Sequence, residues 1–393
     1  MKAQCLDLDR ISSLPPDISE YILTLMPIKD ALRTSILSRK WRYCWKTMPK
    51  LVFEGSLRDC GQSEMDKLVF ALVLILIRHE GPIEELAISI DAYDSDMVAE
   101  FNDRIRYLSG TNKVKKLIFE PVGRYYYQLQ PPFFCLQGLE LLHLANCYFE
   151  HPLTFHGFSG LKSLEFFNVL INPQTFKRFL SDCPLLERIC LTGQYQRRYQ
   201  GLLRENTFTF VELLTCVPLI KTLQVEDDYM RYLATGGMPQ KLPSSLIYLK
   251  HLYLDVCLME QDEISSVLCM IRSSPNLEQI SFRMFSSSEE FPVRKTTSMD
   301  LLDLRDDMSL NLDHLKNFTI ENFGNLAIEI NLLKLFLAKS PMLEGAWLEL
   351  SSDVSVDEEV RLLRDLVQWP PYLRASPSAK LTVTRTTERL CQL

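Results

Sequence analysis

The residues best suited to chemistry are one cysteine and two histidines that lie close together, Cys147, His151 and His156. Thiolate and imidazole groups bind zinc, but a structural zinc site needs four ligands, usually in two spaced pairs. The chain contains no Cys-x-x-Cys and no matching second pair. A core thiol beside two loop histidines therefore explains this cluster better than a metal site does.

Other catalytic and cofactor motifs are missing from the sequence. It contains no Gly-x-Gly-x-x-Gly, no Walker loop, no His-Glu-x-x-His and no Gly-x-Ser-x-Gly. Only 14 glycines accompany 66 leucines, about half the usual share of glycine. This balance disfavours phosphate-binding loops and favours many aliphatic contacts. We expect a protein that is not an enzyme and needs no cofactor or metal.

Charge is distributed unevenly along the 393 residues. The net charge is −7, yet residues 27–50 hold seven basic residues and one acid, so this segment carries +6 and the remainder −13. An acidic protein is not expected to bind nucleic acid. Eleven cysteines, an odd number, are too few for a disulfide scaffold, and the N-terminus lacks a signal-type apolar stretch. The longest apolar run, residues 68–77, is half of a membrane span. These features predict a cytoplasmic and/or nuclear protein with no membrane partner.

A short phrase recurs along most of the chain: an apolar residue, two variable residues, then apolar-x-apolar. In four copies a proline follows the preceding segment, as in Ser274-Pro275-Asn276-Leu277-Glu278. The apolar-x-apolar core is typical of a short strand with one buried face. The first apolar residue of each core lies at positions 86, 117, 142, 164, 189, 223, 252, 280, 318 and 346.

Helical periodicity separates several of these strands. Residues 175–183, 263–273 and 331–339 place apolar side chains three and four positions apart, and Pro184, Pro275 and Pro341 end these helices. Stacked strand–helix units bury faces that one unit cannot bury alone. We therefore predict an α/β solenoid with a parallel sheet, made of degenerate leucine-rich repeats. An ordinary α/β domain with similar strands is the alternative.

The N-terminal segment does not follow this rhythm. A Leu14-Pro15 turn leads into a helix with an apolar stripe at Ile18, Ile22 and Leu25. A second short helix is predicted at residues 29–37 and a third at residues 39–46, with Ser38 as its N-cap. Three short helices bury little core, so such a module is expected to dock on a partner.

These residues resemble a plant-type F-box. The resemblance rests on Leu14-Pro15-Pro16-Asp17, on Pro27-Ile-Lys-Asp30-Ala31 and on the run Thr34-Ser-Ile-Leu37-Ser-Arg-Lys-Trp41-Arg42, in the family's order and spacing. The doubled proline is the one small departure. The C-terminal segment is similar to the FBD module of the same family, through Ser340-Pro341, Leu343-Glu344 and Arg374-Ala-Ser-Pro377. We predict an F-box at 9–53, degenerate repeats at 54–330 and an FBD-like cap at 331–390, closed by a strand at 380–385.

The resemblance implies a substrate-recognition adaptor of an SCF-type E3 ubiquitin ligase. The F-box would dock on a Skp1-like adaptor, itself carried by a cullin and a RING subunit, and the repeats would hold a target protein. The residues expected to contact Skp1 are Leu14, Pro15, Ile18, Ile22, Leu25, Pro27, Leu37 and Trp41. An alternative places Ile36, Trp41 and Trp45 in the core of the F-box itself. The basic cluster Arg33, Arg39, Lys40 and Arg42 either steers an acidic partner or is a solvated helix face.

Target recognition is expected on variable positions of the strands and in long insertions. Aromatic residues beside arginine are typical of binding hot spots, although ordinary loops contain them too. The candidates for target binding are Tyr125, Tyr126, Tyr195, Arg197, Arg198 and Tyr253. The inner face should also carry His143, Glu165, Cys190, Gln224, Ser281 and Thr319.

Two other functions fit a repeat protein of this kind. One is a protein-interaction scaffold that does not direct ubiquitination. The other is a hormone-sensing repeat protein that binds a small acid inside the solenoid. The sequence shows no cluster of basic residues for an acidic hormone or an inositol phosphate.

Overall fold

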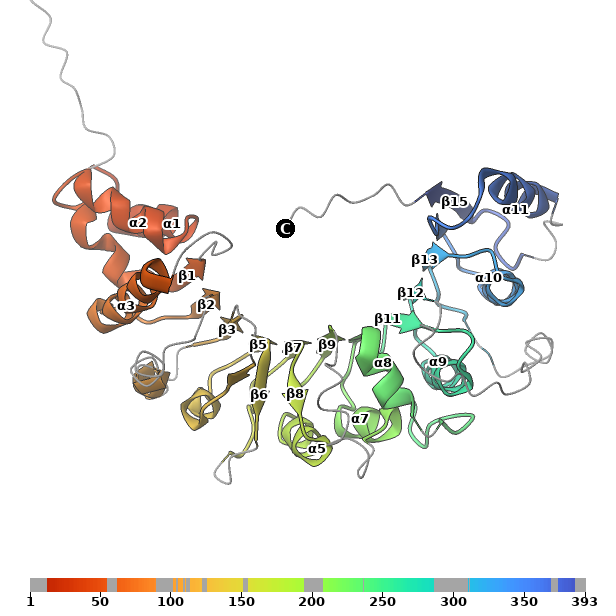
Figure 1. Ribbon diagram of the computed structural model, residues 1–393, viewed down its shortest axis with the longest axis horizontal. Helices are drawn as coiled ribbons and strands as arrows, with labels where there is room; N and C mark the ends of the chain where they lie inside the picture. Colours follow the sequence, from red (N-terminus) through yellow and green to blue (C-terminus); the bar gives the residue numbers. More distant parts are fainter. Residues whose placement is uncertain are drawn as a thin grey trace, which may run out of the picture. The chain divides into compact units, whose positions relative to one another are not determined.

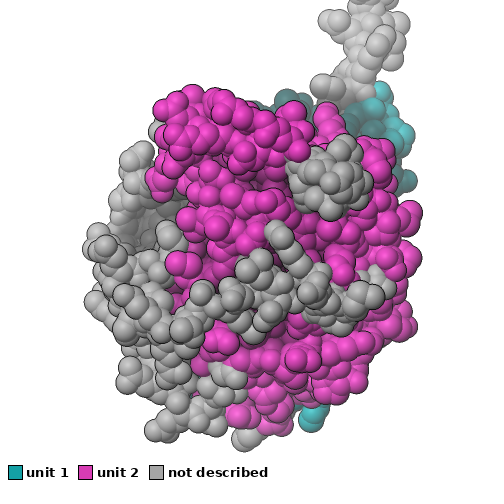
Figure 2. Space-filling model, turned by 90° about the vertical axis from the view of Figure 1, so that its right-hand side faces the viewer, with its two compact units in different colours: residues 1–171 teal, residues 172–393 magenta. Residues whose placement is uncertain are grey.

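The structure, a computed structural model, divides the chain into two compact units, residues 1–171 and 172–393 (Figure 2). Both units are built from parallel strands joined by helices or irregular connections. The residues that it describes are 13–54, 62–89, 102–103, 105–108, 110, 114–121, 126–150, 155–193, 208–235, 237–285, 310, 312–368 and 374–385.

The first unit begins with four short helical segments: α1 (Pro16–Thr24), α2 (Ile28–Arg33) and the 3-10 turns η1 (Thr34–Ile36) and η2 (Trp41–Thr47). Pro15 and Pro27 directly precede α1 and α2, where the fixed φ of proline suits a helix start. The Ser38 hydroxyl accepts a hydrogen bond from the Trp41 backbone N–H at 3.3 Å, but the N-cap position of this segment is Lys40 and not Ser38 as predicted. The third helix is a 3-10 segment that starts two residues later than predicted.

This helical module docks on the first repeat. Helix α3 (Gln62–Arg78) ends in a loop whose Glu80 and Gly81 backbone N–H groups donate to the Lys46 carbonyl at 2.8 and 3.0 Å. The Lys46 ammonium also pairs with the Glu80 carboxylate. A Cβ on Gly81 would lie 2.7 Å from the Thr47 Cα, so only glycine permits this approach. The junction is closely packed.

The strands of the first unit run parallel in chain order: β1 (Lys50–Glu54), β2 (Glu85–Ser89), β3 (Lys116–Phe119), β5 (Leu141–Ala145) and β7 (Ser163–Phe167). A smaller parallel sheet contains β4 (Tyr127–Gln128), β6 (Cys147–Phe149) and β8 (Leu170–Ile171). The short turn η3 (Pro131–Cys135) packs Phe133 against Phe119 with ring centroids 5.1 Å apart. Aromatic side chains thus fill the layer that helices fill elsewhere.

The second unit is a stack of seven parallel strands with helices on one side (Figure 1). Its strands are β9 (Arg188–Thr192), β10 (Thr222–Val225), β11 (His251–Val256), β12 (Gln279–Met284), β13 (Asn317–Phe323), β14 (Gly345–Leu350) and β15 (Lys380–Arg385). Its helices are α5 (Pro173–Ser181), α7 (Phe210–Cys216), α8 (Asp227–Ala234), α9 (Gln261–Ser273), α10 (Ala327–Lys339) and α11 (Val356–Gln368).

The register of the strands matches the repeated phrase. Leu86, Leu117, Leu142 and Leu164 are paired in the first unit. In the second unit the paired residues are Ile189, Leu223, Leu252, Ile280, Phe318 and Ala346. All ten are at most 3% exposed. The predicted α/β solenoid architecture is therefore confirmed, and β15 closes the second unit where a strand was expected.

Candidate interaction surfaces

Helix α1 carries an apolar stripe that faces away from the core of its module. Ile18, Tyr21 and Leu25 are 47%, 62% and 69% exposed. Ser19 and Leu23, on the opposite side of the same helix, are fully buried. A two-turn helix with apolar residues on both faces indicates one face for its own core and one for a partner.

Most of the residues predicted to contact Skp1 lie on the surface of the module. Pro15, Pro27 and Leu37 are exposed with Ile18 and Leu25, and Leu14 and Ile22 are half-buried.

Trp41 requires a correction, because only 3% of it is exposed and it packs inside the module with Trp45. Ile36, which the alternative placed in the core, is 88% exposed. The sequence pattern failed here because 3-10 turns change which positions face inward.

The basic cluster of the module contains both structural and solvated groups. The Lys40 ammonium donates to the Leu14 carbonyl and ties the first turn to the last segment. The Arg33 guanidinium pairs with Asp30 at 2.9 Å, one helical turn away. Arg39 and Arg42 are exposed. Part of the positive charge thus maintains the fold, and the rest is available to steer an acidic partner.

The predicted inner-face residues do share one face of the strands. Cys190, Gln224, Tyr253, Ser281 and Thr319 are register partners on β9 to β13, and His143 and Glu165 are partners on β5 and β7. The row continues to Trp347, which is 41% exposed and covers Gly345 so closely that a Cβ there would lie 2.4 Å from the indole. Trp347 follows Ala346 as Thr319 follows Phe318, so the spacing of the strand phrase could have placed it in this row. Of the insertion candidates, Tyr126 is half-buried, and Tyr125, Tyr195, Arg197 and Arg198 lie outside the described residues.

Charged residues on this face form two compact networks. Arg283 on β12 lies 3.3 Å from Glu226, 3.5 Å from Asp255 and 3.2 Å from Glu321. In the first unit, His143 lies 3.1 Å from both Glu120 and Glu165.

The His143 network favours a protonated imidazole. Burial disfavours that charge, but the hydrogen bonds and negative charges of Glu120 and Glu165 outweigh it and raise the pKa of His143 to about 9. The imidazolium therefore links its own repeat to the repeat before it and to the repeat after it at neutral pH.

One buried acid has the pKa of a catalytic group but a structural role. Burial raises the pKa of Glu263 to about 7. Its carboxylate accepts the Cys257 backbone N–H at 2.8 Å, in the first turn of α9. Glu329 does the same for Leu326 at 3.0 Å in the first turn of α10. Both glutamates thus bind a backbone N–H of the segment that precedes their helix, and Glu329 binds that of the N-cap residue itself.

The cysteine–histidine cluster shows no ligand geometry among the described residues. Cys147 is fully buried on β6, and its thiol contacts the Ala145 carbonyl at 2.8 Å. Burial raises the pKa of this thiol well above its usual range, which disfavours the thiolate that a metal needs. His151 lies outside the described residues. Across the part of the chain that the structure describes, no three His, Cys, Asp or Glu side chains are grouped for a metal ion.

No described helix is both long enough and apolar enough to cross a bilayer.

Two known families match parts of this chain. Residues 11–53 match the F-box domain family. Residues 105–230 match the leucine-rich repeats of the family described as FBD-associated F-box protein At5g56370. The first match covers the four helical segments and the start of β1, and the second covers strands from both units.

Whole proteins of Arabidopsis thaliana are similar as well. The F-box/FBD/LRR-repeat protein At1g13570 is 29% identical over 95% of this chain and 98% of its own length. The FBD-associated F-box protein At5g56370 is 26% identical over 72% of this chain and 61% of its own length. F-box proteins with leucine-rich repeats are in general non-catalytic adaptors, and F-box domains generally bind Skp1 within SCF complexes. The matches and the repeat register together show that this chain is similar to plant F-box proteins with leucine-rich repeats, of the F-box/FBD/LRR-repeat type.

Proposed function

We propose that this protein is a substrate-recognition adaptor of an SCF-type E3 ubiquitin ligase. The F-box binds a Skp1-like adaptor and through it a cullin and a RING subunit. The repeats bind a target protein. No residue of this chain takes part in bond chemistry, because its contribution is to hold a target lysine near the ubiquitin thioester. The proposal places the protein in the cytoplasm and/or nucleus, which imaging of a fluorescent fusion would test.

The exposed stripe on α1 is the single observation that carries this proposal. Ile18, Tyr21 and Leu25 form a continuous apolar face on a domain that matches the F-box family. When a partner covers exposed side chains of this size, the complex is stabilised by about 1.5–3 kcal/mol for each side chain that becomes fully buried. Their own core needs none of them, since Leu23, Ala31, Trp41 and Trp45 supply it.

Substitution of the stripe tests the F-box function. The double variant Ile18→Asp/Leu25→Asp should reduce binding to a purified Skp1-like protein by about 100-fold or more, as expected for two hot-spot residues. Isothermal titration measures the affinity, and circular dichroism should remain unchanged because both side chains are exposed.

The matched control is Val367→Asp on α11, another exposed apolar position at 85% exposure, which should bind like wild type. If the double variant binds as tightly as wild type, the stripe is not the docking face. If wild type binds no Skp1-like protein at all, the adaptor function is wrong and an interaction scaffold remains.

Identification of a target tests the remainder of the proposal. Proximity labelling in cells should recover at least one protein that accumulates when the proteasome is inhibited. The stripe variant should still label that protein without promoting its loss, because its repeats are intact. Equal labelling and equal abundance with and without inhibitor would argue against a degradative role.

A further inference from the structure

A row of charged residues runs along the edge where the strands of both units begin. The residue just before most of these strands is charged, and in most cases its carbonyl accepts two backbone hydrogen bonds from the next repeat, as the Lys221 carbonyl does from Lys250 and His251 at 2.9 and 3.1 Å. We call this row the charge ladder. Its members are Glu84, Lys115, Glu140 and Lys162 in the first unit, and Glu187, Lys221, Lys250, Glu278, Lys316 and Glu344 in the second.

The ladder alternates in sign with one break. Ion pairs join Lys115 to Glu84 at 3.0 Å and Lys162 to Glu140 at 2.8 Å. In the second unit, the pairs are Lys221–Glu187 at 2.8 Å, Lys250–Glu278 at 2.7 Å and Lys316–Glu278 at 2.9 Å. Among the described ladder positions, only Lys221 and Lys250 place like charges on adjacent strands. Strands lie about 4.8 Å apart, so this neighbourhood is unfavourable.

Lys221 and Lys250 form ion pairs on opposite sides, away from each other. Lys221 pairs with Glu187 on the repeat before it, and Lys250 pairs with Glu278 on the repeat after it. Hydrogen bonds from Lys250 and Lys316 lower the pKa of Glu278 to about 2, so this acid stays ionised at physiological pH. The space between Lys221 and Lys250 is therefore flanked by two cations.

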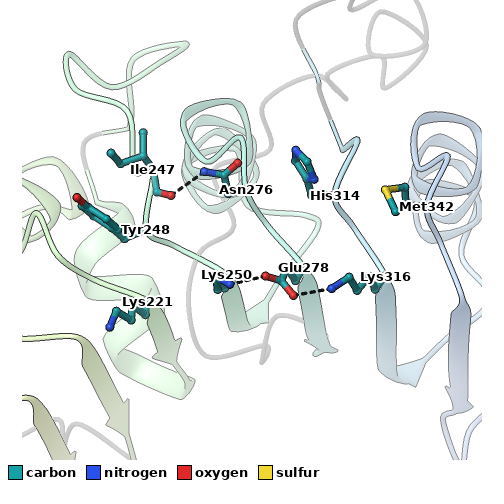
Figure 3. Close-up of a pocket in the computed structure, with 9 residues that line it drawn as sticks. All are labelled: Lys221, Ile247, Tyr248, Lys250, Asn276, Glu278, His314, Lys316 and Met342. Atoms are coloured by element: carbon teal, nitrogen blue, oxygen red, sulfur yellow. Dashed lines mark hydrogen bonds and ion pairs between the residues drawn. The ribbon is translucent and has the colours of Figure 1, made fainter.

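A pocket of about 500 Å³ opens at this break (Figure 3). Its floor is the ladder from Lys221 to Lys316, which contributes three lysines and Glu278. Its wall is the row two residues earlier in each repeat, which includes Tyr248 and Met342. Tyr248 lies above Lys221 in Figure 3 and is 45% exposed, and its neighbour Ile247 is 50% exposed.

The wall is held in place by the fold. The Asn276 side-chain amide donates to the Ile247 carbonyl at 2.8 Å and fixes the turn that presents Ile247 and Tyr248. The three lysines and Glu278 of the lining sum to a charge of +2, in a chain whose net charge is −7. The pocket thus combines a cationic floor with a wall that presents Ile247, Tyr248 and Met342 beside the polar Asn276 and His314, although no cluster of lysines is visible in the sequence.

We propose that this pocket binds an acidic segment of the target protein, with an Asp or Glu carboxylate between Lys221 and Lys250 and an apolar side chain of the same segment against Tyr248 and Ile247. The bound carboxylate restores the alternation of the ladder, which is the charge complementarity that selects this occupant. Naming the occupant a target rests on the proposed adaptor function. Binding itself does not, because it uses a different unit from the F-box.

Selection of peptides by the purified full-length protein tests this site without a known target. A random peptide library displayed on phage should yield sequences that combine Asp or Glu with an adjacent aromatic or aliphatic residue. The variant Lys221→Gln/Lys250→Gln should bind the selected peptides about tenfold more weakly, since two exposed charge contacts are lost. Tyr248→Ala should weaken them independently, and binding should fall with salt.

The matched control is Lys115→Gln/Lys162→Gln, which removes two equally exposed ladder lysines from the first unit and should retain binding. Selection of peptides without acids, or equal binding by the pocket variant, would overturn the proposal. So would lysine-dependent binding of inorganic phosphate with no selected peptide, or lysine-dependent self-association. Titration of a Skp1-like protein with the same variants should be unchanged, which separates a failure here from a failure of the F-box function.

Discussion

At the residue scale, the exposed fraction of a side chain distinguishes core residues from surface residues where the residue type does not. Trp41 and Ile36 lie five positions apart in a strongly conforming F-box segment, yet the tryptophan is 3% and the isoleucine 88% exposed. Single-sequence patterns assume a helical period of 3.6 residues, and the 3-10 turns η1 and η2 break that assumption. By contrast, the α1 stripe follows the ordinary period, so Ile18 and Leu25 were predictable from spacing alone.

His143 gives a residue-scale prediction about pH. Its pKa is raised to about 9 in the folded protein, from an ordinary value of 6.5. The stabilisation is therefore complete below about pH 6.5 and is lost as the pH rises through 9. We expect His143→Gln to lower the free energy of unfolding by about 1–2 kcal/mol at pH 6, after allowance for solvent screening, and by much less at pH 9.5. Urea unfolding of both proteins across this range measures the difference.

The control for His143 is His251→Gln. Burial lowers the pKa of His251, so His251 is already neutral above pH 6.5. The difference in unfolding free energy between wild type and this variant should therefore stay constant between pH 6.5 and 9. A wild-type advantage over His143→Gln that stays constant across that window would mean that the two carboxylates do not hold the proton.

At the element scale, strand positions were the most predictable feature and short elements the least. The ten predicted strand cores all fall in register, because a period of two with leucine at the buried position is a strong signal. The two- and three-residue strands β4, β6 and β8 were missed, since such lengths show no period. The pocket was also missed, because Lys221, Lys250 and Lys316 come to line one pocket only when four consecutive repeats are aligned.

Gly81 gives an element-scale prediction about the junction between the F-box and the first repeat. Gly81→Ala would place a Cβ 2.7 Å from the Thr47 Cα and 2.8 Å from its carbonyl oxygen. Backbone atoms cannot yield as a side chain can, so we expect a loss of about 1–3 kcal/mol in unfolding free energy and faster proteolysis near Lys46.

Gly160→Ala is the matched change for Gly81, because its Cβ would lie 3.4 Å from the nearest backbone atom. It should shift stability by less than about 0.5 kcal/mol. If both alanine variants unfold alike, the close approach at Thr47 is not a constraint on the junction.

At the scale of the whole molecule, the charge is divided between the N-terminal module and the rest of the chain. The +6 of residues 27–50 lies on the docking module, and most of the acidic remainder, −11 of −13, lies in residues 51–393. The charge pattern of the sequence predicted this division, and the prediction that nucleic acid is not a partner stays a prediction. The boundaries at 53, 54, 330 and 331 remain predictions, and the division into compact units at residue 171 does not test them.

The C-terminal strand gives a prediction at this scale. Strand β15 covers the edge of β14, and Ser376 anchors the approach to it by donating to the Leu343 carbonyl at 2.7 Å. Removal of residues 374–393 should expose a strand edge that pairs with other molecules. We expect concentration-dependent aggregation by light scattering and a loss of more than about 2 kcal/mol in unfolding free energy.

Removal of residues 386–393 alone is the control truncation, since it leaves β15 in place. It should remain monodisperse with wild-type stability. Identical behaviour of the two truncations would show that β15 does not act as the closing strand.

The charge ladder has a consequence for how such an array changes its length during evolution. In an alternating stretch, a ladder residue such as Glu278 pairs with oppositely charged residues of the repeats on both sides. Loss or duplication of one repeat would therefore bring two like charges together, whereas loss or duplication of a neighbouring pair would keep the signs in step. Such an array is expected to gain or lose repeats most easily in pairs. Lys221 and Lys250 are adjacent like charges, which is the result expected when a single repeat is lost or duplicated. Such a change creates a pair of neighbouring cations for recognition without any new side chain.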